Sequence, residues 1–111
     1  MEGGAEISIA CSQLKWDKIC FTGSSEKGKL VAQAAAKNLV PYILELGGKN
    51  ITIVDESSNA NFAGKKIGSA ITVNCGQVCI SPGYVYIHES KKQEFINATL
   101  QVFKDSYGKD P

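Results

Sequence analysis

Residues 18–26 of this chain have the sequence KICFTGSSE, and they predict the fold of its first half. A β-rich run ends at Gly23, and the serines that follow it are typical residues for starting a helix. Apolar residues then recur at helical spacing until Pro41, which stops the helix, and a second apolar run occupies residues 42–46. The pattern predicts a β-α-β unit with parallel strands and a right-handed crossover. Residues 3–14, upstream of this unit, predict a short helix or an irregular lead-in.

The second half of the sequence predicts two more strands, each followed by a helix with one apolar face. A strand at residues 50–54 leads through a capping cluster into a helix, and a strand at residues 84–88 leads into a helix over residues 91–106. Gly64 and Gly68 weaken the first of these helices by roughly 1 kcal/mol each relative to Ala, unless close packing needs them. The predicted core faces of the chain's helices are Leu30, Val31, Ala34, Ala35 and Leu39; Phe62, Ala63, Ile67, Ala70 and Ile71; and Phe95, Ile96, Thr99, Leu100 and Phe103.

The composition excludes several classes of protein. Hydrophobic residues make up 43% of the 111 residues and charged residues 21%, which indicates a globular chain and not a disordered one. The net charge of +1 gives no electrostatic basis for binding nucleic acid or an anionic membrane. No apolar run approaches the ~20 residues of a transmembrane helix. The start of the chain lacks the basic region and apolar core of a secretory signal peptide.

The four cysteines predict reduced thiols and not a disulfide framework, since no secretion signal accompanies them. We therefore expect a cytoplasmic or other reducing intracellular compartment. The spacing of Cys75 and Cys79 is not that of a zinc knuckle, and no second Cys/His pair lies nearby, so no metal site is predicted.

The turn at residues 23–30, GSSEKGKL, almost matches a phosphate-binding P-loop. Its last position should be Ser or Thr to ligate Mg²⁺, but the chain has Leu30 there. The dinucleotide fingerprint G-x-G-x-x-G is also absent. A helix that starts directly after a strand still points bare N–H groups and its positive dipole end at the turn. On these residues alone, an anion site and an ordinary strand-to-helix turn are both open.

Two side chains are candidates for catalysis. Cys79 lies where a helical pattern gives way to Pro and Gly, and a thiol near the end of an element can have a lowered pKa and act as a nucleophile. The alternative is a small buried hydrophobe. Glu45 is a lone carboxylate in an apolar run, and it either lies on a solvated face or is buried and acts as a general base. The glycines that follow it at positions 47 and 48 permit close approach of a ligand or another backbone.

Three motifs resemble successive signatures of the aldehyde dehydrogenases: FTGS at residues 21–24, LELGGK at residues 44–49 and GQVC at residues 76–79. They occur in the family's order and at about its spacing, and the resemblance extends from about Gly3 to Pro111. Short stretches at residues 17–19, 34–37 and 107–111 look most like the class 3, fatty-aldehyde-type branch. Gly83 departs from this branch, whose members often have Asp there.

The resemblance implies an α/β fold that joins pieces of two domains. Residues 1–46 resemble the last part of a Rossmann-like cofactor-binding domain, and residues 47–111 resemble the first part of a catalytic domain. The implied cofactor is NAD or NADP, and the implied cofactor-binding residues are Gly23, Ser24, Gly28, Leu46 and Gly47. A complete member of the family would be a homodimer, and full-length relatives include membrane-associated proteins.

The resemblance also implies a reaction, in which an aldehyde substrate is oxidised to a carboxylic acid. Cys79 would attack the aldehyde to form a thiohemiacetal and then a thioester, and Glu45 would activate the water that hydrolyses it. The Asn that completes the family's oxyanion site lies upstream of this segment, and Asn74 is not assigned that role. Because so much of the family's site lies elsewhere, we expect the isolated chain to be inactive.

Two other functions remain open at this point. One is a nucleotide-binding module that uses the turn at residues 23–29 without thiol chemistry, in which case triphosphate binding would depend on Mg²⁺. The other is a non-catalytic remnant or interaction protein that keeps the family's packing, in which case Cys79 would show no special reactivity.

Overall fold

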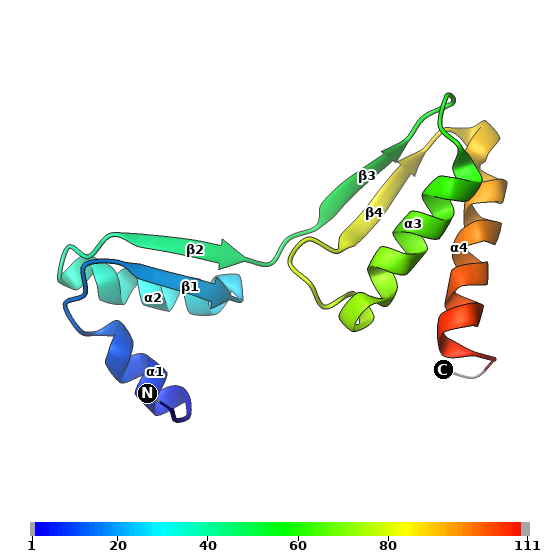
Figure 1. Ribbon diagram of the computed structural model, residues 1–111. Helices are drawn as coiled ribbons and strands as arrows, with labels where there is room; N and C mark the ends of the chain where they lie inside the picture. Colours follow the sequence, from blue (N-terminus) through cyan, green and yellow to red (C-terminus); the bar gives the residue numbers. More distant parts are fainter. Residues whose placement is uncertain (1, 110–111) are drawn as a thin grey trace. The chain divides into compact units, whose positions relative to one another are not determined.

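The computed structural model describes residues 2–109, which form two compact units divided after Gly47. Each unit contains its own helices and its own two-stranded parallel sheet (Figure 1). The predicted α/β class is therefore confirmed. The assignment of the two parts of the chain to a cofactor-binding and a catalytic domain stays a prediction.

The first unit is the predicted β-α-β unit with one helix before it. Its strands pair in parallel, as predicted, with Gly23 opposite Leu46 at their carboxyl ends. One face of this sheet is covered by the crossover helix, whose buried residues are Gly28, Ala34 and Ala35. The elements are α1 (Ala5–Ser12), β1 (Ile19–Gly23), α2 (Ser25–Lys37) and β2 (Tyr42–Leu46).

The end of α2 differs from the prediction, because the helix stops at Lys37 and the chain turns before it reaches Pro41. Leu39 has a left-handed φ of 55° and is 90% exposed, so its placement on the core face was wrong. The turn instead buries Val40, whose N–H donates to the carbonyl of Ala35 at 3.0 Å. Leu30, also predicted to be in the core, is exposed.

The second unit is also built on a parallel pair of strands, and its two long helices lie side by side (Figure 1). The core joins one face of the sheet to both helices, and its buried members are Val54, Ala60, Ile67 and Phe95. The elements are β3 (Asn50–Val54), α3 (Ala60–Thr72), the 3-10 turn η1 (Val73–Gly76), β4 (Pro82–Ile87), the 3-10 turn η2 (Glu89–Lys91) and α4 (Lys92–Tyr107).

The turn between β3 and α3 has the capping chemistry that the sequence predicts. Asn59 caps α3, and its side-chain oxygen accepts from the Phe62 N–H at 2.9 Å. Hydrogen bonds from the Ser57 and Ser58 side chains lower the pKa of the Asp55 carboxyl in the same turn. These bonds hold the chain as it reverses from strand to helix.

The contact between α3 and α4 depends on two glycines. A Cβ added at Gly64 would lie 2.6 Å from the carbonyl oxygen of Phe95 and 2.9 Å from the Cβ of Ala98, so the backbones meet too closely for any side chain. One added at Gly68 would lie 3.1 Å from the Cβ of Val102. Close packing therefore accounts for both glycines, although Gly stabilises a helix less than Ala does.

This close contact also explains why the predicted core faces of α3 and α4 were partly wrong. Phe62 and Ala70 are exposed on α3, and Ile96 and Leu100 are exposed on α4. Small residues occupy the contact instead: Ala60, Gly64 and Gly68 on α3, and Ala98 on α4. Hydrophobicity alone favoured the larger side chains, but small residues occupy the points where the helices approach most closely.

The opposite face of the second sheet is open and apolar. Ile53 is 73% exposed and Tyr86, its partner across the strands, is 61% exposed. Ile51 and Tyr84 form the next pair on the same face, and the rings of the two tyrosines meet edge to face with centroids 5.6 Å apart.

Among residues 2–109, no helix is long and apolar enough to cross a membrane.

We predict that Gly64→Ala lowers the free energy of unfolding by about 1–2 kcal/mol. The added Cβ would meet a backbone oxygen at 2.6 Å, so overpacking should cost about 2–3 kcal/mol, in the upper part of the usual range, and the better helix propensity of Ala returns ~1 kcal/mol. Urea unfolding followed by circular dichroism measures the change. Ser69→Ala, an exposed substitution on the same helix, is the matched control and should leave the midpoint nearly unchanged. A Gly64→Ala chain as stable as the wild type would show that the helices are not in tight contact.

Candidate functional site

The carboxyl ends of β1 and β2 form one edge of the first sheet, and the predicted cofactor residues gather there. Gly23 and Leu46 are paired in register, and Ser24 follows directly as the N-cap of α2. Ligands of parallel α/β sheets bind at this edge, outside the carboxyl ends of the strands.

Ser24 begins α2 with two hydrogen bonds. Its hydroxyl oxygen accepts from the Lys27 N–H at 3.2 Å, and its carbonyl accepts from the Gly28 N–H at 2.8 Å. The remaining N–H groups of a first helical turn have no partner within the helix, so they face outward with the positive end of the dipole. This end of α2 can therefore offer donors to an anion, and the role of the turn in cofactor binding stays a prediction.

Gly28 acts through packing. It is buried, and a Cβ added to it would lie 2.8 Å from the Cδ2 atom of Leu46 and 3.6 Å from the Cδ1 atom of Leu44. The absence of a side chain lets the first turns of α2 lie directly on β2. Gly28 and Leu46 thus fix the position of the helix N-terminus relative to the sheet edge.

A groove of about 480 Å³ lies between α1 and α2, close to the same helix start. Its walls include Ile9 from α1 and Leu30 and Val31 from α2, and Phe21 of β1 contributes to it as well. Ile9 and Leu30 are exposed apolar residues, which the sequence analysis did not assign to a site. In the sequence, the available signal for this groove was the apolar character of these two residues.

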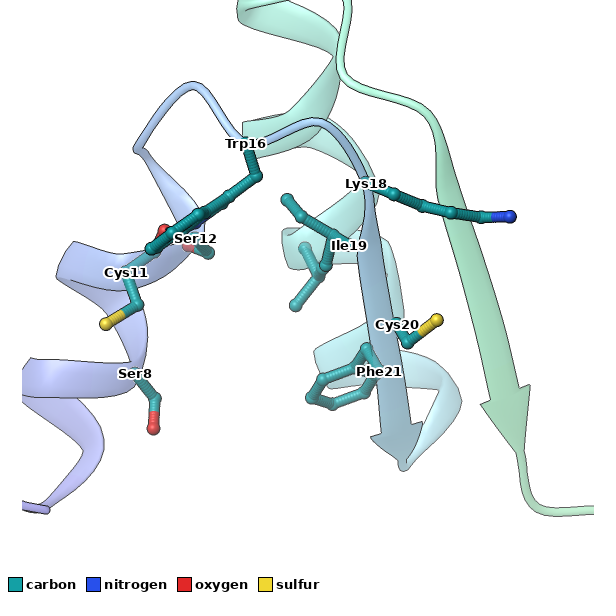
Figure 2. A pocket seen from close by; sticks show the side chains of 9 residues that line it. Ser8, Cys11, Ser12, Trp16, Lys18, Ile19, Cys20 and Phe21 are labelled. Atoms are coloured by element: carbon teal, nitrogen blue, oxygen red, sulfur yellow. The ribbon is translucent and has the colours of Figure 1, made fainter. Parts of the chain in front are cut away.

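Figure 2 shows a second pocket, of about 340 Å³, between α1 and β1. Ile19 and Phe21 point from β1 toward α1, whereas Cys20 points to the other side of the strand. Trp16 lies near the end of α1, where its indole N–H donates to the carbonyl of Cys11 at 2.8 Å. The two pockets share the lining residues Ser8, Ser12, Phe21 and Val31, so they are neighbours beside α1.

Glu45 lies on the face of the first sheet that α2 leaves open. Leu44 and Leu46 face Gly28 of α2, and side chains alternate along a strand, so the carboxylate of Glu45 points the other way. It is paired with Thr22 and exposed. Within this unit Glu45 is on a solvated face, and its role as a base stays a prediction.

Cys79 belongs to the second unit and lies in the loop between α3 and β4. This loop begins with three residues in the left-handed region: Asn74 at φ 49°, Cys75 at φ 54° and Gly76 at φ 74°. The Asn74 side chain donates to the carbonyl of Gln77 at 3.0 Å, which closes the turn. Cys79 follows as an exposed free thiol, so the alternative of a buried small hydrophobe does not hold within the described residues.

Asn50 is a residue near this loop that the sequence analysis missed. Its side-chain amide nitrogen donates to the carbonyl oxygen of Cys79 at 2.8 Å and to that of Ser81 at 2.9 Å. The signal was a polar residue at the first position of an otherwise apolar strand. The partners could not be inferred, because they lie 29 and 31 residues further along the chain.

The structure thus brings together Gly23, Ser24, Gly28 and Leu46 at one sheet edge, with Gly47 following, while Cys79 is carried by the second unit.

His88 is exposed at the end of β4, with its Nδ1 atom 2.8 Å from the Ser90 hydroxyl. Over residues 2–109, no group of three or more His, Cys, Asp and Glu side chains could hold a metal ion.

Comparison with known proteins gives one consistent family. The sequence model described as "Aldehyde dehydrogenase family" matches residues 3–111. The chain is 42% identical to the 4,4'-diaponeurosporen-aldehyde dehydrogenase of Staphylococcus aureus, over 99% of this chain and 24% of that protein. It is 34% identical to the aldehyde dehydrogenase family 3 member A2 of Rattus norvegicus, over 99% of this chain and 23% of that protein.

Solved structures agree with these sequence matches. A substrate-bound AldH from Staphylococcus aureus is similar with a TM-score of 0.88 at 41% identity, over 99% of this chain and 24% of that one. A betaine aldehyde dehydrogenase from Staphylococcus aureus in complex with NAD⁺ is similar with a TM-score of 0.79 at 30% identity, over 88% of this chain and 20% of that one. The chain therefore spans about a quarter or less of the length of these proteins.

Proposed function

Because the chain belongs to the aldehyde dehydrogenase family, with family 3 members among its relatives, we propose that it serves NAD(P)-dependent oxidation of an aldehyde to a carboxylic acid. The observation that carries the proposal is the exposed thiol of Cys79, at the end of the GQVC motif and on a turn open to substrate. The chain spans 20–24% of the relatives' length, so the activity is proposed for a protein that supplies the rest of the site.

Cys79 is proposed to be the nucleophile. Its thiolate attacks the carbonyl carbon of the aldehyde, and the carbonyl oxygen becomes the oxyanion of a thiohemiacetal on the sulfur. The backbone N–H of Cys79 is well placed in sequence to donate to that oxyanion, since it belongs to the attacking residue itself. When bound, NAD(P) supplies the acceptor for the hydride that leaves the thiohemiacetal carbon. Cys79 then holds the acyl group as a thioester.

Glu45 is proposed to be the base that completes the reaction. Its carboxylate takes a proton from a water molecule, which attacks the thioester carbon and releases the carboxylic acid from the sulfur of Cys79. The open sheet face on which Glu45 stands leaves room for that water within its own unit.

The sheet edge of the first unit fits the cofactor. The N–H groups at the start of α2 suit the pyrophosphate, because they can donate hydrogen bonds to an anion. Gly23 and Ser24 lie beside them, where the backbone can approach that anion closely. The groove between α1 and α2 suits the adenine ring, because apolar side chains, including Ile9 and Leu30, form part of its walls and it reaches Lys27 in the first turn of α2. Gly47 follows Leu46 without a side chain, which leaves the end of β2 accessible to the rest of the cofactor.

The same groove distinguishes this proposal from a Mg²⁺-dependent nucleotide-binding module. Leu30 occupies the position where a P-loop has its Mg²⁺-ligating hydroxyl, and its side chain lines the groove. The Leu30 side chain suits contact with a base ring and offers no ligand to a cation.

We expect an electrophilic aldehyde mimic to label Cys79 before the other exposed thiols, Cys20 and Cys75. Peptide mapping of a family-length enzyme that carries residues 3–111 gives the order of labelling. Cys75→Ser should leave the label on Cys79, and Cys79→Ser should remove it. Preferential labelling of Cys20 or Cys75 in the wild-type protein would contradict the assignment and favour a non-catalytic interaction protein.

Glu45→Gln should slow thioester hydrolysis more than acylation, by roughly the 10²–10⁴-fold that a general base contributes. In the same family-length enzyme, the burst of NADH should persist while the steady-state rate falls. Glu94→Gln, an exposed carboxylate in the first turn of α4, is the matched control and should change neither phase. If both phases of Glu45→Gln slow by the same factor, Glu45 is not the base for hydrolysis.

We further expect the isolated chain, residues 1–111, to produce no NADH from a medium-chain aldehyde. Catalysis needs the thiol, the hydride acceptor and the oxyanion donors held together, and such positioning supplies ~7–11 kcal/mol of barrier reduction. The open apolar face of the second sheet should also make the isolated chain associate. Spectrophotometry at 340 nm and gel filtration test both points. Turnover that disappears in Cys79→Ser would show the segment to be self-sufficient.

A further inference from the structure

We propose that Asn50 is a positioning residue for Cys79, holding the loop that carries the thiol against the start of β3. This inference rests on the proposed role of Cys79 as the nucleophile. The geometry behind it lies entirely within the second unit. One side-chain nitrogen, the Nδ2 atom of Asn50, donates to two carbonyl oxygens of the loop, those of Cys79 and Ser81.

The chemistry of this contact is specific to an amide. The Nδ2 atom carries two hydrogens, and each is directed to a different carbonyl, at 2.8 and 2.9 Å. A hydroxyl has one hydrogen and can satisfy only one of the two acceptors, and a carboxylate has none and would repel both. Asn50 is therefore the type of residue that can fasten two points of the loop at once.

The two carbonyls belong to one tight turn. The Ser81 N–H donates to the carbonyl of Val78 at 2.9 Å, so residues 78–81 form a closed turn. Asn50 fastens the Cys79 carbonyl inside this turn and the Ser81 carbonyl at its end. Because the carbonyl of Cys79 is fixed, the peptide plane beside the reacting residue has one orientation, while the thiol itself stays exposed.

The backbone around Asn50 is arranged to bring it to the loop. Asn50 pairs with Pro82 and Ile51 pairs with Tyr84, so Gly83 is an extra residue that forms a bulge in β4. A Cβ added at Gly83 would lie 3.1 Å from the Cα of Lys49 and 3.2 Å from the N of Asn50. The bulge and its glycine therefore permit the close approach on which the two hydrogen bonds depend.

The test compares Asn50→Ala and Asn50→Asp with Asn59→Ala in the 111-residue chain. Asn59 is the matched control, because it also uses its side chain for a backbone hydrogen bond in the second unit, at the N-cap of α3 and away from the Cys79 loop. Iodoacetamide alkylation gives the ratio of the Cys79 rate to the Cys75 rate. Hydrogen exchange measured by mass spectrometry gives the protection of the backbone at residues 78–83, and circular dichroism gives the unfolding midpoint.

Both Asn50 variants should lower the preference for Cys79 over Cys75 by about 3- to 10-fold, which corresponds to the loss of about one net hydrogen bond. Exchange at residues 78–83 should become faster. Asn59→Ala should lower the unfolding midpoint and leave both loop readouts unchanged. Asn50→Asp should recover part of the loop protection near pH 4, where its protonated carboxyl can donate once, and Asn50→Ala should not.

The possible failures are distinguishable. Alkylation that favours Cys79 in the wild type and is unchanged in both Asn50 variants overturns the inference alone. Loop readouts that fall equally in Asn50→Ala and Asn59→Ala overturn it too, because the effect is then one of general stability. A family-length enzyme in which Cys79 is not labelled preferentially overturns the proposed role of the thiol, and the inference with it.

Discussion

Both units of this chain obey one constraint: parallel strands cannot be joined by a tight turn, so a helix must carry the chain back to the same end of the sheet. In the first unit α2 does this between β1 and β2, and in the second unit α3 does it between β3 and β4. How closely each helix packs on its neighbours then determines the arrangement of the elements within each unit. Gly28 lets α2 lie on Leu46, and Gly64 lets α4 lie on α3.

The two crossovers place their candidate functional groups at opposite ends of the strands. In the first unit the carboxyl ends of β1 and β2 meet the N-terminus of α2, which suits an anionic cofactor. In the second unit the loop after α3 delivers Cys79 to the beginning of β4, beside Asn50 at the beginning of β3. The candidate cofactor residues thus lie at the carboxyl ends of one strand pair, and the proposed nucleophile lies at the amino ends of the other.

Local patterns were sufficient to predict the elements, and insufficient to predict how closely they pack. The β-α-β order followed from apolar runs separated by capping residues, and Ser24 and Asn59 cap helices as such residues do. The faces of α3 and α4 were partly wrong, because Phe62 and Leu100 are more hydrophobic than the small residues that a close contact requires. The sequence motifs located Cys79, but the Asn50 contact depends on a bulge at Gly83 and on pairing across 29 residues, which no local pattern encodes.

The confinement of strand pairing to each unit bears on how this chain folds during synthesis. Within the described residues, β1 pairs only with β2 and β3 only with β4, so no sheet waits for a strand from the other unit. A ribosome adds ~5–20 residues per second, and domains fold as they emerge. Of the described strands, both of the first unit have been made once residue 46 has left the exit tunnel, whereas the second unit must wait for β4 and then α4. During that interval the apolar side chains of β3 are uncovered, which favours aggregation or capture by a chaperone.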